Sequence, residues 1–386
     1  MTLVSALLVT LAGLWLLWPN AGDVPDRVPA RAEGTSFVDV TVTGPADPTT
    51  GSIPVELPGG ESSRMQSPGP SIPLAEGDRI TAVDISQVSQ PGVDPLVFMD
   101  FQRELPIALL AIVYALVVLL VARWRGLAAM AGLGIAFVVL LGFTMPALLA
   151  GESAIGVALV TSSLVMFVTL YLAHGLSART STALLGTLVG LALTAGLAAW
   201  ASGAAQITGT NDEMSAFLPS SAPGADLRGI ALCGIVLAGM GVLNDVTITQ
   251  ASAVWELRAL APAASRSELF TSAMRIGRDH IASTVYTIAF AYVGAALPLL
   301  MMVWLVDQSP TTALTSGEIA EEVVRTLVGS IGLVLAIPIT TAIATLTVPG
   351  PAAEGSTTPE PASDPELMAP VSEAWAAGPA PGTPAI

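Results

Sequence analysis

The chain has 386 residues, of which 53% are apolar and only 11% charged, with a formal net charge of −16. A soluble domain usually carries about a quarter charged residues, so this composition excludes an ordinary soluble protein. Successive runs of roughly 20 apolar residues, the length that crosses a bilayer, predict a multi-pass membrane protein. Net acidity argues against nucleic acid as a partner, and the single cysteine excludes an intrachain disulfide or a cysteine-based metal centre.

The first apolar segment is short and occupies residues 3–18, LVSALLVTLAGLWLLW, ending at Trp18-Pro19. A secretory signal peptide would begin with basic residues, and this segment has none before it. We therefore predict an uncleaved anchor over residues 1–19, with a cleaved signal peptide as the alternative.

Residues 20–104 differ in kind, because Pro, Gly, Ser and Asp interrupt short alternating runs. SFVDVTVTG alternates at period two, as a half-buried strand does. GSIPVEL, GDRITAVDIS and PLVFMDF repeat the pattern, each bounded by Gly or Pro. The stretch predicts a small, barrel-like β-domain, which could be a spacer or a sensor and ligand-binding module.

The remaining apolar runs predict helices within a transmembrane domain spanning residues 105–347. The predicted helices cover residues 106–122, 126–148, 154–173, 181–203, 229–254, 281–305 and 324–346. With the first segment they make eight, so the predicted fold class is an α-helical polytopic membrane bundle with a small extracytoplasmic β-domain. The tail over residues 348–386 is rich in Pro and Ala, lacks periodicity, and is predicted to be disordered.

Arginines in short loops predict the orientation, because cytoplasmic loops carry an excess of basic residues. The three Arg-bearing loops fall on the same side of the predicted helices, and their arginines are Arg123, Arg125, Arg179, Arg258, Arg266, Arg275 and Arg278. We therefore expect these loops and the tail in the cytoplasm, and the β-domain outside.

One predicted helix carries an acid near the middle of its apolar run. Asp245 lies about 15 Å from the predicted cytoplasmic end, where a carboxylate costs about 2.5–3.5 kcal/mol on insertion scales. Asp245, Thr249, Ser252 and Glu256 recur at helical spacing as one stripe, flanked by Asn244. Such residues normally face the bundle interior, so the stripe predicts an interior polar site. A purely structural role for Asp245 is the alternative.

A second polar group begins the next predicted helix, where Arg278, Asp279 and His280 stand at its cytoplasmic entrance. Asp279 would cap that helix, and Thr284 and Thr287 would continue a polar face toward Asp245. The preceding residues, 256–280, form an amphipathic connection that we expect to lie along the inner membrane surface. The predicted polar site thus comprises Asn244, Asp245, Thr249, Ser252, Glu256, Asp279, Thr284 and Thr287; we predict no catalytic, cofactor-binding or metal-binding residues.

A different helix carries small residues at four-residue spacing. Thr182, Gly186, Gly190 and Thr194 share one face, and such faces let helices approach closely. Pure packing is the favoured interpretation.

A set of positions follows a recognisable pattern: Gly241, Asp245, Ser252 and Glu256, then Gly277, Asp279, Ala291, Tyr292, Gly294, Leu297 and Pro298, with Gly186 in the stretch 174–190 and the L-x-x-G-D element at Leu74, Gly77 and Asp78. In these positions the chain resembles the YibE/F-like family of multi-pass bacterial membrane proteins. The likeness covers about residues 74–306. Tyr286 stands where the family pattern leads us to expect Asn. The resemblance implies a permease-like protein of the bacterial cell membrane, without a defined activity.

Three functions compete. The first is a secondary permease that moves a small solute or ion through an interior polar site around Asp245; the chain lacks a P-loop and would not hydrolyse ATP. The second is an envelope sensor or assembly protein whose external β-domain binds another envelope protein, or a homo-oligomer. The third, an intramembrane aspartyl protease, lacks the Gly-x-Gly-Asp signature at both Asp245 and Asp279. The lipid bilayer is the expected environment in each case.

Overall fold

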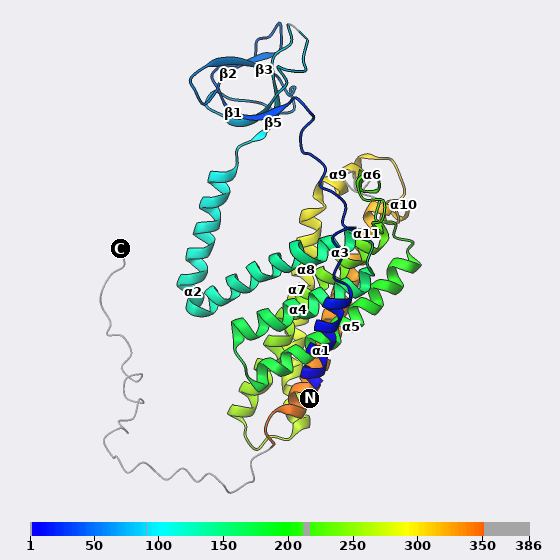
Figure 1. The fold of residues 1–386 in the computed structure, drawn as a ribbon. Coiled ribbons are helices and arrows are strands. Elements are labelled where there is room, and N and C mark those ends of the chain that lie inside the picture. The colour runs from blue at the N-terminus through cyan, green and yellow to red at the C-terminus, as the bar shows by residue number, and fades with distance from the viewer. Residues whose placement is uncertain (1, 91, 211–216, 351–386) are drawn as a thin grey trace, which may run out of the picture.

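A computed structural model describes residues 2–90, 92–210 and 217–350 of the chain. It consists of a small strand barrel and a bundle of helices, joined by one long helix and by the irregular segment of residues 17–35 (Figure 1). The predicted disordered tail lies outside the described residues from position 351 onward.

The barrel confirms the predicted β-domain. Its strands are β1 (Ser36–Val42), β2 (Ser52–Glu56), β3 (Ser62–Gln66), β4 (Arg79–Asp84) and β5 (Leu96–Phe101). They close in the order β1-β2-β3-β5-β4, with β3 and β5 parallel and the other pairs antiparallel, which is the connectivity of an OB-fold. Alternate residues such as Val40, Val42, Ile53 and Val55 fill the interior, so the period-two runs have the burial they predicted.

A short polar junction joins the barrel to the helix that follows. Arg103 donates to Asp100 at 2.6 Å, and its guanidinium lies 5.6 Å from the centre of the Phe101 ring. The hydrogen bond from Arg103 lowers the pKa of the Asp100 carboxyl. The helix begins at Glu104, so these contacts brace the exit from β5.

The helical part contains twelve segments in the described residues. They are α1 (Thr2–Leu16), α2 (Glu104–Val139), the π-helix η1 (Leu140–Thr144), α3 (Met145–Leu149), α4 (Ala154–His174), α5 (Ala178–Ala204), α6 (Leu218–Ser221), α7 (Leu227–Leu260), α8 (Arg266–Ala295), α9 (Leu297–Leu305), α10 (Pro310–Leu314) and α11 (Gly317–Thr347). By length and composition five of the described spans could cross a membrane, or six if α8 and α9, bent by 67°, form one. The predicted count of about eight is not confirmed; it would further require α1 and two crossings by the segment Glu104–Leu149.

The long helix α2 is broken at Arg123, whose φ of 55° and ψ of −134° are not helical. The break falls between the predicted helices 106–122 and 126–148. At 1.5 Å per residue the 46-residue segment would measure about 69 Å, more than twice the ~30 Å bilayer core. Its first part is exposed along its length and stands clear of the other helices (Figure 1).

Helix α1 packs against the bundle. Trp18, just beyond its end, stacks on Phe143 with ring centres 5.8 Å apart. A side chain at Gly13 would lie 2.6 Å from Val160 of α4. The uncleaved anchor stays a prediction, and these contacts favour it.

Helices α5, α7 and α11 form the tight core of the bundle, and small residues make it possible. A Cβ at Gly186 would fall 2.2 Å from Thr340 Oγ1, and one at Gly332 would fall 2.2 Å from Thr194 Oγ1. The Thr182–Thr194 face therefore packs against α11, which confirms the packing interpretation of that small-residue face.

The connection between α7 and α8 differs from the prediction. Arg258 is buried and donates to the carbonyls of Pro262 and Ala264 at 3.0 and 2.7 Å. Ser265 and Glu268 form a capping box, so α8 begins at Arg266 rather than near Ile281.

Three expectations are corrected by this early start. Residues 266–280 do not form a separate surface helix, because Leu269 and Ala273 are buried against Val254 and Ala344. The predicted helix 281–305 begins fifteen residues earlier and breaks at Ala296. Asp279 lies inside α8 and caps nothing.

We expect Gly186→Ala and Gly196→Ala to act in opposite directions, although both lie in α5. The new Cβ at position 186 would meet Thr340 Cβ at 3.0 Å and Cγ2 at 3.1 Å as well as its hydroxyl, so rotating that side chain gives no relief. Overpacking of this kind costs about 1–3 kcal/mol. Gly196 has open space around it, so Ala there should stabilise the helix by about 0.5–1 kcal/mol. Thermal unfolding in detergent measures both; equal shifts would contradict the packing.

The barrel should fold without the helices, because its core consists of its own strands. Residues 24–102 expressed alone should give a β-type circular dichroism spectrum and one cooperative thermal transition. A coil spectrum without a transition would refute this expectation.

Candidate functional site

Helices α7 and α8 run side by side and bring Asp245, a predicted site residue, next to His280, which is not one of the predicted site residues. Asp245 Oδ2 lies 3.8 Å from His280 Nε2. Along α7, Asp245 is about 22 Å from the Leu260 end, and along α8, His280 is about 21 Å from Arg266. The two residues therefore stand at the same level of the helix pair, near the middle of both helices.

The direction of Asp245 corrects the prediction. Its side chain is 71% exposed, on the open face of α7, rather than turned into the bundle. Leu243, Val246 and Thr247 occupy the core-facing positions around it and are fully buried. The early start of α8 brings His280 to the level of Asp245, and the predicted partner stretch, residues 284–292, begins one helical turn further along α8.

The other predicted site residues are distributed along the open faces of the two helices. Thr249 donates to the backbone carbonyl of Asp245, Thr284 to that of His280 at 2.9 Å, and Thr287 to that of Ser283 at 3.2 Å. Ser252 is half-buried, and Glu256 and Asp279 are exposed. Asp245, Thr249, Ser252 and Glu256 form a polar lane along α7, which leads from the loop end of the hairpin to the Asp245–His280 pair.

Two polar atoms at this site, one on His280 and one on the neighbouring Asn244, are buried without a hydrogen-bond partner. His280 Nε2 and Asn244 Oδ1 are both buried, and neither has a hydrogen-bond partner in the described part of the chain. The 3.8 Å separation of Asp245 and His280 exceeds a hydrogen bond. One bridging water or a small closure would connect them. A carboxylate and an imidazole in this relation can exchange a proton.

Metal binding has no support here. The described residues contain no group of three or more His, Cys, Asp or Glu side chains that could hold an ion. His280 and Asp245 are a pair, and His174 lies at the end of a different helix, α4.

Sequence reasoning missed Gln250 as a structural centre. Its amide donates to the carbonyl of Ala273 in α8 at 2.9 Å and to Thr341 Oγ1 in α11 at 2.7 Å. A Cβ at Gly277 would lie 3.2 Å from its Oε1, so glycine admits the amide. The available signal was its position among Thr247, Ala251 and Val254, because a polar residue on a core-facing stripe must find internal partners.

The comparisons with known proteins agree with the polar segments. The family model described as YibE/F-like protein matches residues 110–350, which includes the resembling positions from Gly186 to Pro298 and begins after the barrel, so Leu74, Gly77 and Asp78 lie outside it. No curated protein and no solved structure matches the chain. Since the matched region covers more than half of the sequence, the chain belongs to the YibE/F-like family.

Proposed function

We propose that this chain is a proton-dependent permease of the bacterial cell membrane. The observation that carries the proposal is the Asp245–His280 pair, a carboxylate and an imidazole 3.8 Å apart near the middle of two long helices. Ionisable residues at this depth of a membrane-spanning helix are costly and mark ion and proton pathways.

The open face supports a path to the pair. Glu256 lies near the loop end of α7, and Ser252 and Thr249 follow between it and Asp245. A proton that reaches the Asp245 carboxylate can pass through one water to His280 Nε2, leaving a carboxylate and an imidazolium. Asp245 is neutral while it holds the proton, which removes the cost of its mid-membrane charge, and transfer to His280 restores the carboxylate beside a cation. The net charge of the pair rises by one in either form, and this change is what would be coupled to the movement of a small solute.

The arginine distribution supports one orientation. Arg258 at the α7–α8 turn and Arg266 at the start of α8 belong to the loop predicted to be cytoplasmic. Under the positive-inside rule the α7–α8 turn and the tail face the cytoplasm, and the barrel lies outside. The polar lane then opens toward the cytoplasm.

The second candidate function is an envelope sensor or assembly protein that acts through the barrel. It is favoured by the position of the barrel at the far end of the exposed part of α2, away from the bundle (Figure 1). Deleting the barrel separates the two candidates, because a permease would keep its flux and a sensor would lose its response.

Asp245→Asn, which mimics the protonated form, should abolish proton-coupled flux while the protein still inserts and folds. His280→Gln should reduce the flux strongly, since Gln cannot accept and release the proton. The measurement is the lumenal pH of proteoliposomes that contain a trapped dye, with a panel of solute gradients imposed across the membrane. Difference infrared spectra over a pH titration add a readout that needs no substrate, in which a protonated-carboxyl band should be missing from Asp245→Asn.

Asp307→Asn provides the matched control, since it removes a carboxylate from the exposed loop after α9 and should leave flux and spectrum unchanged. If Asp245→Asn carries wild-type flux, or no carboxyl band depends on Asp245, the proposed proton site is wrong.

Single cysteines should report the orientation in a Cys233→Ala background, because Cys233 is buried and is the only native thiol. Ser62→Cys in the barrel and Ser221→Cys at the end of α6 should react with an impermeant reagent on intact cells. Ala263→Cys, in the α7–α8 turn, should react only after lysis; it replaces no capping residue, unlike a change at Ser265. The reverse pattern would mean that the topology is inverted.

A further inference from the structure

A row of four polar residues crosses the outer surface of the barrel. Thr41 of β1 is paired with Glu56 of β2 on one side and with Arg79 of β4 on the other. Gln102, which follows β5, donates its backbone N–H to the Arg79 carbonyl at 2.9 Å. The register therefore places Glu56, Thr41, Arg79 and Gln102 side by side across neighbouring strands.

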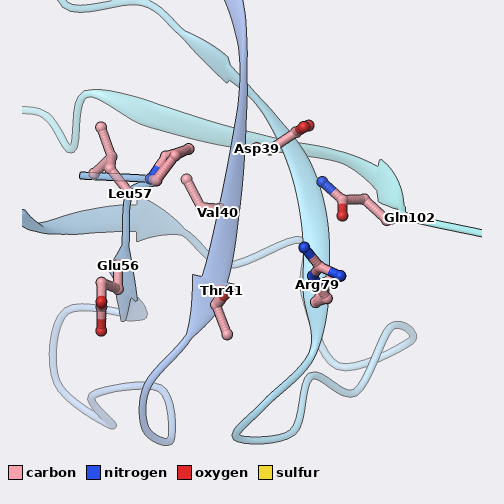
Figure 2. A pocket seen from close by; sticks show the side chains of 8 residues that line it. Asp39, Val40, Thr41, Glu56, Leu57, Arg79 and Gln102 are labelled. Carbon is pink, nitrogen blue, oxygen red and sulfur yellow. The ribbon is translucent and has the colours of Figure 1, made fainter. Parts of the chain in front are cut away.

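This row lies in a pocket of about 310 Å³. Leu57 and Pro58 form an apolar wall beside Glu56. Asp39 adds a second carboxylate two residues before Thr41 on β1, where it is paired with Thr81 of β4. In Figure 2, β1 runs between Glu56 and Leu57 on one side and Arg79 and Gln102 on the other. The volume is at the lower end of the range for small-molecule sites.

Of the charged side chains that line the pocket, Asp39 is used within the barrel. Asp39 accepts a hydrogen bond from Thr81 at 3.1 Å. Within the described residues, neither Glu56 nor Arg79 takes part in an ion pair. The pocket therefore presents a carboxylate and a guanidinium without an ion-pair partner on either side of Thr41, and the Gln102 amide lies beyond Arg79.

The spacing of these groups determines which ligand can reach both charges. Neighbouring strands are about 4.8 Å apart, so the Glu56 and Arg79 backbones are separated by about 10 Å, a gap that their side chains shorten. A free amino acid carries its two charges on a single carbon and spans less of this gap. The charged ends of an extended dipeptide lie about 7 Å apart.

We propose that this barrel pocket binds a short zwitterionic peptide of dipeptide size. The ammonium group contacts Glu56, the carboxylate contacts Arg79 through its planar pair of donors, and the peptide unit lies over Thr41. Leu57 and Pro58 cover one side chain. The inference concerns the barrel alone and is independent of the proton site at Asp245.

The test uses the full chain in detergent and titration calorimetry with dialanine, N-acetyl-dialanine and dialanine amide. Wild type should bind dialanine, and each blocked analogue should bind about tenfold more weakly, since each has lost one charge-assisted contact. Arg79→Gln should bind dialanine and its amide equally well. Glu56→Gln should lose its preference for dialanine over the N-acetyl form. Loss of discrimination at one end only is a result that misfolding does not produce.

Arg64→Gln and Glu61→Gln are matched controls, because both residues are exposed on the barrel outside the pocket. Both controls should retain the full wild-type preference. The proposal is overturned if wild type binds no dialanine, if it binds the blocked analogues as tightly, or if Arg79→Gln still discriminates against the amide.

Discussion

The close approach of α5, α7 and α11 decides how every other part of the bundle is placed. Gly186 lies against Thr340 and Gly332 against Thr194, so the helix axes come nearer than larger residues would permit. The buried Thr187–Thr247 hydrogen bond, 2.6 Å long, joins α5 to α7 at the same depth. These contacts fix the rotation of α7 about its axis. With Thr247 turned inward, Asp245 can only stand on the opposite side.

The sequence predicted those elements whose residue pattern is compatible with only one kind of structure. Period-two runs bounded by Gly and Pro can bury one face only as strands, and the barrel follows. Small residues at four-residue spacing on α5 have no use except close packing, which is what Gly186 and Gly190 provide. Long apolar runs similarly gave most of the long helices, although their bounds and the number of membrane crossings were not determined.

The wrong predictions arose where one residue pattern is compatible with two different structures. The amphipathic stretch before Ile276 fits a membrane surface as well as a neighbouring helix; the Ser265–Glu268 capping box was the local signal that α8 begins there. The stripe through Asp245 was equally ambiguous. Thr247 and Gln250 are polar too, so α7 has hydrophilic residues on both sides, and only tertiary packing selects which of them are buried.

The break at Arg123 and the exposure of the first part of α2 separate the barrel from the bundle. Coupling between two sites requires an element with two alternative states, and each ligand must bind one of these states more tightly than the other. Two covalent routes join the barrel to the bundle. One is the irregular segment of residues 17–35 between α1 and β1, and the other is α2, whose first part packs on nothing before the helix breaks at Arg123. The coupling free energy between the two sites should therefore be close to zero in the monomer. Occupancy of the barrel would then leave the environment of Asp245 unchanged.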